Sequence, residues 1–467
     1  MHITDLQSTG LYIPFAKLEA DTVTEVKSRL LDTIISFIGG ALSLPEEEIQ
    51  SLCATLDKVN DVRPVYPTDR KTSLEMAGFL NAFLLRCADW GDTYRRKNEV
   101  FGHPSDQVAA ILALCDAAPV SGERVVELTH FAYQFYAVLG ERMPGLRQPW
   151  DYTSALSLTI PLIAGLCFNA SEKRLQNALY LSAAGGSVLH QVRTQEVTSL
   201  KSGASAYATA RGLWCYRVSE AIRAPSSMFD GRDGWYRVIA PLEGELVGMG
   251  ADGTYAPVEV KSFPCFHVAQ SPVECAISIH NQLEKRIEKI RRVVIHVSET
   301  DAKRIIRADQ QKYPVTQSDA DHHIKYCLSI ALQHGALTPL HYKPEFLHAK
   351  PTRQIIDCIE VEVLNPEKLR TLGNQSDACL LEVYLENGET ITVQRSRAEG
   401  SFAGLKTSER VLQLRKVVAK KRKMLEEVCG MDLMPVERLV YDLESHNGSE
   451  LLDLIQTSME TRNREQG

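Results

Sequence analysis

The chain has 467 residues, 44% of them hydrophobic and 24% charged, which is typical of a globular protein large enough for two domains. Its formal net charge of −7 argues against a nucleic-acid partner, and its 11 cysteines lie singly without a CxxC pair, as in reduced intracellular proteins. No secretory signal is recognisable, and the longest apolar run, residues 154–168, is short for a membrane span. We therefore expect a cytoplasmic protein, or one of another reducing compartment such as the mitochondrion, with no membrane partner.

The first half of the sequence has the pattern of packed helices. Thr22–Glu25 fits a capping box, apolar residues then recur every three or four positions up to Ile38, and Gly39-Gly40 is expected to end this helix. Ser105 is expected to cap a second helix, and Asn169–Glu172 to open a third.

A stretch of small residues, SGASAYATARG at 202–212, predicts a helix at the centre of a bundle, because small side chains permit close approach of neighbouring helices. A flexible linker is the alternative, but the Ala, Tyr and Arg residues are unusual for a linker.

The character changes near residue 255, where runs of β-branched and aromatic residues begin to alternate with helical patterns. Asn387-Gly388 between two such runs predicts a hairpin with a type I′ turn. Helices are expected over 271–290 and 318–334, and helical patterns return from Ser408, where a lysine- and arginine-rich run is interpreted as a solvated helix face. Strands are expected over 255–263, 293–297, 355–364 and 378–385.

The order helical, mixed, helical predicts a mainly α protein with two domains. We expect an all-helical bundle built from residues 1–255 and 401–467, and a smaller α+β lid domain, residues 256–400, inserted between them.

The stretch CADWGDTYRRKNEVFGHPSD, residues 87–106, is dense in proton-handling groups. If the preceding helix continues, Asp89 and Thr93 share one face, flanked by Asp92. His103 precedes a helix start, whose free N–H groups suit a carboxylate. A capped helix with a structural aspartate pair would explain the same residues.

Three further positions are candidates for a site. Lys201 lies among small residues, where a lysine can anchor an anion, although a surface lysine at a helix start would look the same. His267 and Gln270 occupy an expected loop between a strand and a helix. In SDADHHIKY the two aspartates are explained by the helix dipole, and adjacent histidines diverge too far on a helix to share a metal, so one of them is expected to face a cleft.

These segments, in this order, resemble the 2-methylcitrate dehydratase family (MmgE/PrpD), which also includes cis-aconitate decarboxylase and iminodisuccinate epimerase. The resemblance runs from about Leu30 to Arg395 and is most specific in ADWGDT with GHPSD, LKSGA, FPCFHVAQSPVEC, and DADHHIKY followed by GALTPLHY. It implies a homodimer with an active site between the helical and lid domains, and neither a metal nor another cofactor.

Two departures from the family pattern bear on the reaction. Tyr152 stands at a family histidine position, and Gln270 stands where many relatives have histidine, with His267 three residues earlier. The dehydratases resemble this chain in carrying glutamine there, which favours dehydration. The loop between Thr93 and His103 is also longer than in the dehydratases that this chain resembles, and it adds the basic residues Arg95, Arg96 and Lys97.

The resemblance and the residues together predict a hydro-lyase that converts 2-methylcitrate or a related alkylcitrate, both tricarboxylic acids, into the corresponding aconitate. A cis-aconitate-type decarboxylase, an epimerase and a non-catalytic tricarboxylate-binding relative are the alternatives. In the leading hypothesis Asp89 is the base or orients His103, Lys201 and His103 bind carboxylates, Thr93 positions the substrate and Tyr152 donates a proton. The expected catalytic residues are Asp89, Thr93, His103, Tyr152 and Lys201, and the expected substrate-binding residues are Arg147, Arg193, His267, Gln270 and His322.

Overall fold

The computed structural model describes residues 6–57, 59, 61–67, 70–96, 99–146, 149–194, 197–284, 286–308, 311–373 and 377–465. The described chain is mainly helical, as predicted, with two small sheets. Among these residues, no helix combines the length and apolar character that crossing a membrane would need.

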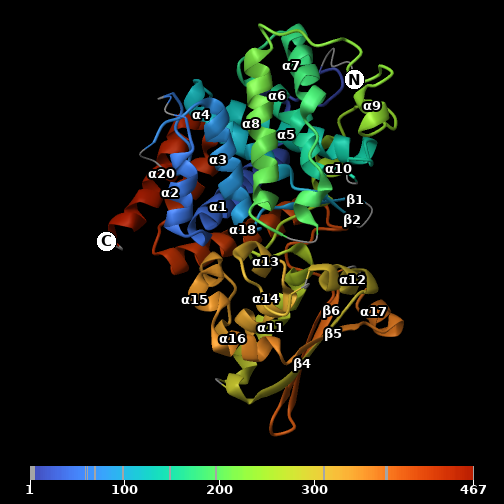
Figure 1. Cartoon of the computed structure of the whole chain (residues 1–467), viewed down its shortest axis with the longest axis vertical. Helices are drawn as coiled ribbons and strands as arrows, with labels where there is room; N and C mark the ends of the chain where they lie inside the picture. The colour runs from blue at the N-terminus through green and yellow to red at the C-terminus, as the bar shows by residue number, and fades with distance from the viewer. Residues whose placement is uncertain are drawn as a thin grey trace.

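One hydrophobic core takes its residues from both ends of the chain, with buried side chains between Leu6 and Val260 and between Phe402 and Met459. The N-terminal helix α1 (Ala20–Ser43) packs against α18 (Thr407–Cys429), so a blue and a red helix lie together in Figure 1. The other helices around this core are α2 (Glu46–Ala54), α3 (Leu74–Cys87), α4 (Val108–Ala117), α5 (Gly122–Arg142), α6 (Leu156–Cys167), α7 (Glu172–Gly185), α8 (Leu200–Val218), α9 (Trp235–Val238), α10 (Gly250–Tyr255), α19 (Met434–Tyr441) and α20 (Gly448–Glu465).

Helix α8 packs its small residues into this core, but it is not central as predicted, because Tyr207 and Trp214 on its outer face are 56% and 51% exposed. It packs against α3, α6 and α7, and Gly212 explains the closeness of one contact. A Cβ atom on Gly212 would come within 2.6 Å of the Ile160 side chain on α6, so a larger residue would force the two helices apart.

A second core is formed by residues 263–391 and occupies the lower part of Figure 1. Its mixed sheet has the order β5-β4-β6-β7, with β4 and β5 parallel and the other pairs antiparallel. The strands are β4 (Ile290–Val297), β5 (Ile359–Val363), β6 (Cys379–Leu385) and β7 (Thr390–Arg395). The helices are α11 (Gln270–Leu283), α12 (Glu299–Ala308), α13 (Gln317–Ala320), α14 (Ile324–His334), α15 (Pro344–Leu347), α16 (Lys350–Ile356) and α17 (Pro366–Thr371).

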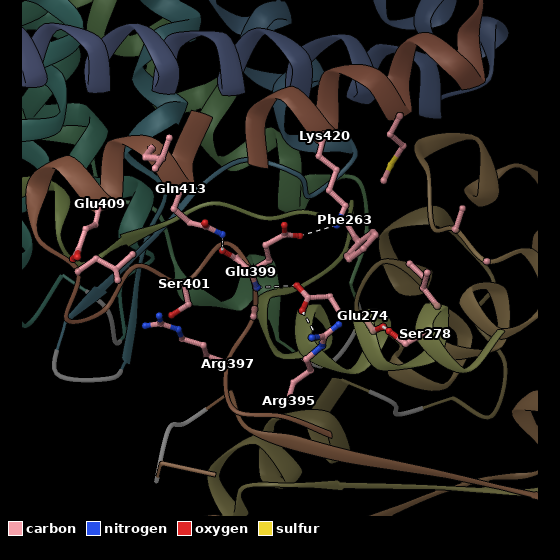
Figure 2. Close-up of a pocket in the computed structure, with 17 residues that line it drawn as sticks. Phe263, Glu274, Ser278, Arg395, Arg397, Glu399, Ser401, Glu409, Gln413 and Lys420 are labelled. Atoms are coloured by element: carbon pink, nitrogen blue, oxygen red, sulfur yellow. Dashed lines mark hydrogen bonds and ion pairs between the residues drawn. The ribbon is translucent and has the colours of Figure 1, made fainter. Parts of the chain in front are cut away.

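The chain crosses between the two cores twice, and the crossings touch. The Val260 N–H donates to the Gly400 carbonyl at 3.0 Å, and a Cβ atom on Gly400 would lie 1.9 Å from the Val260 oxygen, so only glycine fits. A cavity of about 690 Å³ flanks this junction (Figure 2). There Glu399 is tied to α11 through Glu274, which accepts from its N–H at 2.8 Å, and to α18 through Lys420 at 2.7 Å.

A short sheet of order β2-β1-β3 lies beside the first core. It comprises β1 (Thr93–Arg96), β2 (Glu99–Gly102) and β3 (Val258–Glu259). Because β3 is immediately before the first crossing, this sheet brings residue 261 next to the loop that precedes β1.

Several local expectations are wrong. Helix α1 begins at Ala20 and continues through Gly39-Gly40 to Ser43, and no capping box forms at Thr22. Glu25 is instead fully buried and accepts from Arg29 at 2.8 Å and from Arg410 at 3.0 Å. The two glycines permit close contact with α3 and its C-terminal loop rather than ending α1.

The hairpin is present, but its turn differs from the prediction. Only Gly388 has a positive φ, of 83°, whereas a type I′ turn needs positive φ at both central residues. The lysine-rich segment of α18 is also not wholly solvated. Lys421 is buried, and its ammonium group donates to Asp32 at 2.5 Å and to the Trp90 carbonyl at 3.0 Å.

Candidate active site

The expected helix over 318–334 is interrupted at Asp321-His322-His323. Helix α13 ends at Ala320 and α14 starts at Ile324. The His323 imidazole accepts from the Tyr326 N–H at 3.1 Å and so caps α14. The break leaves Asp321 and His322 free to project toward the first core, an outcome that uninterrupted helical periodicity does not predict.

Lys201, in the first turn of α8, meets this break. Its Nζ lies 2.9 and 3.1 Å from the two Asp321 carboxylate oxygens and 3.1 Å from His322 Nδ1. Asp321 and His322 are also hydrogen-bonded to each other, and the Phe266 ring stacks on the imidazole at 5.3 Å. Lys201 and Asp321 are almost completely buried, so one ion pair joins the two cores.

Asp89 follows the end of α3 rather than continuing it, so the expected shared helix face with Thr93 does not form. Its φ is +43°, a left-handed conformation that is uncommon for a residue with a side chain. The carboxylate accepts from Lys261 Nζ at 2.7 Å and from Arg86 at 3.1 Å, and Lys261 also donates to the Asp89 carbonyl at 2.9 Å. These bonds hold the strained backbone in place.

The two carboxylates belong to a single cluster. Side-chain ligand atoms of Asp89, Asp321 and His322 all lie within 4.8 Å of one another. Burial raises the pKa of Asp89, but the positive charges of Lys261 and Lys201 outweigh this effect and hold the pKa well below its usual range. Asp89 is therefore an ionised group between two ammonium ions.

His103 lies behind Asp89, oriented by the neighbouring loop. Its Nδ1 contacts the Asp92 carbonyl, which can only accept, so Nδ1 carries the proton and Nε2 is the acceptor. Burial, then Arg86 and Lys261, lower the pKa of His103 well below its usual value. The imidazole is consequently neutral, which suits a base rather than the carboxylate-binding cation expected from the sequence.

Ser105 does not cap the following helix. A 3-10 turn at Pro104–Gln107 precedes α4, and the Ser105 N–H and hydroxyl both donate to Asp92, at 3.2 and 2.7 Å. Tyr133 donates to the other carboxylate oxygen of Asp92 at 2.5 Å. Asp92 thus fixes the loop that carries His103, and its role is structural.

Tyr152 packs against His103, edge to face, with ring centres 5.3 Å apart. The Arg193 guanidinium lies over the phenol ring, 4.4 Å from its centre, and donates to Asp151 at 2.6 Å. Burial raises the pKa of Tyr152, and its buried hydroxyl has no hydrogen-bond partner among the described residues. The hydroxyl is therefore a protonated donor beside a neutral imidazole.

A cavity of about 1070 Å³ opens next to the cluster, with walls from both cores. Cys87, Ser202 and His322 line it and adjoin Asp89, Lys201 and Asp321. Its wall has three arginine or lysine side chains and two carboxylates, and two of these cations are paired with acids, Arg193 with Asp151 and Arg304 with Asp301. The charged and histidine residues of the wall are Arg193, Arg304, Lys343, His190, His267, His322, His323, His348, Glu48 and Asp319.

Only some of the remaining expected site residues lie at the cavity. Arg193 and His267 line the cavity, whereas Arg147 lies outside the described residues. Gln270 is engaged with its own loop: its amide accepts from the Phe263 N–H at 3.1 Å and donates to the Phe263 and Cys265 carbonyls at 3.0 and 3.1 Å. Thr93 is buried, and its hydroxyl has no partner among the described residues.

Three cluster residues escaped sequence reasoning: Arg86, Lys261 and Asp321. Lys261 lies between Glu259 and Ser262 in VEVKSFPCF, so nothing in its local segment distinguishes it. Arg86 looks like an ordinary cation at a helix C-terminus. Asp321 looks like an acid placed at a helix N-terminus to interact favourably with the helix dipole. That explanation holds for Asp319, which forms a capping box with Thr316, but fails for Asp321.

The ligand set of Asp89, Asp321 and His322 has the spacing of a metal site, but its charge balance does not fit a divalent ion. Lys261 and Lys201 already lie within 3.1 Å of the carboxylate oxygens that a metal would need. A dication there would meet two ammonium groups at close range. The lysines themselves act as the resident cations.

Fold and site together define a class of protein: it is mainly helical and holds a buried cluster of cations and carboxylates between two cores. The MmgE/PrpD N-terminal domain model matches residues 11–244, and the MmgE/PrpD C-terminal domain model matches residues 263–432. The chain belongs to the MmgE/PrpD family. It is 25% identical over 353 residues to the mitochondrial 2-methylcitrate dehydratase of Yarrowia lipolytica, covering 69% of this chain and 65% of that protein.

Proposed function

We propose that this protein is a lyase that removes water from 2-methylcitrate or a related alkylcitrate and forms the corresponding aconitate. The supporting observation is the gathering of Lys201, Lys261 and Arg86 around the Asp89 carboxylate, close to the neutral imidazole of His103. Removing a proton beside a carboxylate builds up negative charge, and fixed cations in a dry site offset it. Family membership and the similarity to a dehydratase support the same reaction.

His103 Nε2 is the proposed base, in place of Asp89. His103 Nε2 is the acceptor nitrogen of a neutral ring, whereas the Asp89 carboxylate already accepts from Lys261 and Arg86. Tyr152 gives its phenolic proton to the departing hydroxide, so that water leaves. His103 then holds the proton taken from carbon, and its return to Tyr152 resets both groups.

The substrate carboxylates bind to Lys201, His322 and the cavity wall, including Arg193 and His267, and Thr93 positions the substrate. The smaller core serves as a lid, because Asp321 and His322 come from it whereas Lys201 and Asp89 come from the helical core. Closing the lid would complete the cluster and exclude water. We further propose that the working unit is a homodimer.

The test is a panel of citrate, 2-methylcitrate, a longer alkylcitrate and cis-aconitate, with products identified by mass. Loss of water from a citrate supports the proposal. Release of carbon dioxide from cis-aconitate would replace it with decarboxylation, which the same cations would also assist because that reaction likewise leaves an anion beside retained carboxylates. Calorimetric binding of these acids without turnover would instead indicate a non-catalytic relative.

A further inference from the structure

Asp106 is a buried acid next to the proposed site that the mechanism does not use. It lies in the 3-10 turn after His103 and is 1% exposed. Its Oδ1 is 3.6 Å from Arg86 Nε, while the same guanidinium donates to Asp89 at 3.1 Å. Arg86 is therefore shared between an acid of the candidate site and an acid behind it.

The contacts of Asp106 are unusually poor for a buried carboxyl group. Neither of its oxygens has a hydrogen-bond partner among the described residues, and Arg86 Nε and Nη1 also lack one there. Buried carboxylates are normally paired and hydrogen-bonded, because an unsatisfied charge is costly. Burial accordingly raises the pKa of Asp106 to about 7. The charged and titratable side chains facing it are Arg86, Asp92, Tyr136, Asp151, Tyr152 and Arg193.

We propose that Asp106 is a positioning residue that acts through Arg86 and sets how much positive charge the site offers to a polycarboxylate. This inference rests on the proposed tricarboxylate site. When Asp106 is protonated, only Asp89 balances Arg86, and the cluster has a surplus of positive charge. When Asp106 is ionised, it neutralises the guanidinium and repels an incoming anion.

The experiment is calorimetric binding of tricarballylate, a tricarboxylate without the leaving hydroxyl, to the whole chain between pH 6.5 and 8.5. The affinity of the wild type should fall by about tenfold over this range, because a like charge at close range typically shifts a pKa by about one unit or more. In Asp106→Asn, which cannot ionise, the affinity should stay high and change far less. Asp116→Asn, a remote acid paired with Arg63, should retain the wild-type slope.

A second measurement does not depend on the variant folding. Binding to the wild type at pH 7, repeated in buffers of different ionisation enthalpy, should show proton uptake, because the bound anion raises the pKa of Asp106. Equal pH slopes in wild type and Asp106→Asn, or no proton uptake, would overturn the inference. Failure of the wild type to bind tricarballylate at any pH would instead refute the proposed site itself.

Discussion

Lys261 Nζ lies 2.7 Å from Asp89 Oδ2, and this contact fixes a crossing between the two cores to the loop that follows α3. Both side chains are almost completely buried. Lys261 follows the last buried residue of the first core in this segment, Val260, and precedes Phe263 of the second core. A single ion pair thus orients a proposed catalytic cluster and the smaller core at once.

Separating this pair should destabilise the fold strongly. Asp89→Asn or Lys261→Met alone leaves a buried charge without its partner, at a cost of about 3–5 kcal/mol in the free energy of unfolding. The double variant should cost less than the sum, with a coupling of about 1–3 kcal/mol by urea unfolding. The exposed pair Lys303–Glu299, at the same 2.7 Å, is the matched control and should couple by less than about 1 kcal/mol. If the losses of unfolding free energy in the two single variants simply add in the double variant, Asp89 and Lys261 do not stabilise each other.

Removing the imidazole of His103 should reduce the proposed reaction without unfolding the protein. For His103→Gln we expect kcat/KM to fall by about 10²–10⁴-fold, the usual contribution of a positioned base. The pKa of His103 is well below its usual value, so the imidazole stays unprotonated as the pH is lowered. Activity should therefore not fall through protonation of His103 until the pH is far below 6.5. Activity assays across pH check both points, with the exposed His446→Gln as control. Near-normal turnover in His103→Gln would remove this residue from the mechanism.

Tyr152→Phe separates the phenolic hydroxyl from the packing of the ring. The ring contacts with His103 and Arg193 remain, so the fold and KM should change little, whereas kcat should fall by about 10²-fold if the hydroxyl is the proton donor. Stability should be unchanged or slightly higher, because the buried hydroxyl has no partner among the described residues. Steady-state kinetics and thermal unfolding test this, with Tyr384→Phe on β6, whose hydroxyl donates to Glu382, as control. An unchanged kcat would assign proton donation to another group.

The broad organisation follows from sequence because it depends on periodicity. Helical spacing in both terminal parts and β-branched runs between them predict the mainly helical chain, and Lys201 stands out because it precedes a run of small residues. Arg86, Lys261 and Asp321 could not be found in this way, since each is ordinary in its local segment and becomes special only through a partner more than a hundred residues away or across a turn.

The wrong local predictions have the same cause, which is a contact with a distant part of the chain. Gly39-Gly40 resembles a helix end by residue type, but α3 packs so closely there that a Cβ atom on Gly40 would lie 1.9 Å from the Leu84 carbonyl. The glycines are required by a neighbour, not by a turn. Likewise, Lys421 belongs to a charged run, yet its position on α18 places it over Trp90 and against Asp32. Tertiary contact overrides the local pattern in both cases.

Glu274 should make stability depend on pH at the junction shown in Figure 2. Burial raises the pKa of this carboxyl from 4.5 to about 7. The folded state therefore favours the neutral form: no stability is lost below pH 4.5, and the penalty grows until the pH passes about 7. Glu274→Gln keeps an acceptor for the Glu399 N–H but cannot ionise, so it should be more stable than wild type by up to about 3 kcal/mol at pH 8 and nearly equal at pH 4.5.

Urea unfolding at the two pH values measures this difference. Glu360→Gln, on the exposed face of β5, serves as the control and should show no comparable gain at pH 8. An equal effect of Glu274→Gln at both pH values would mean that packing, rather than ionisation, separates the variant from the wild type.

Removal of metal ions should leave the proposed activity intact. The ligand atoms of Asp89, Asp321 and His322 lie within 4.8 Å of one another, so a metal-dependent enzyme is the competing interpretation. Lys201 and Lys261 donate to the carboxylate oxygens and supply the positive charge that a metal would otherwise provide. Dialysis against a chelator should therefore change turnover by less than about twofold. Lys201→Met should instead lower turnover by at least about 10²-fold. Loss of activity on chelation, restored by zinc or magnesium, would show that the three residues hold a metal and that the lysines are its displaced counter-charges.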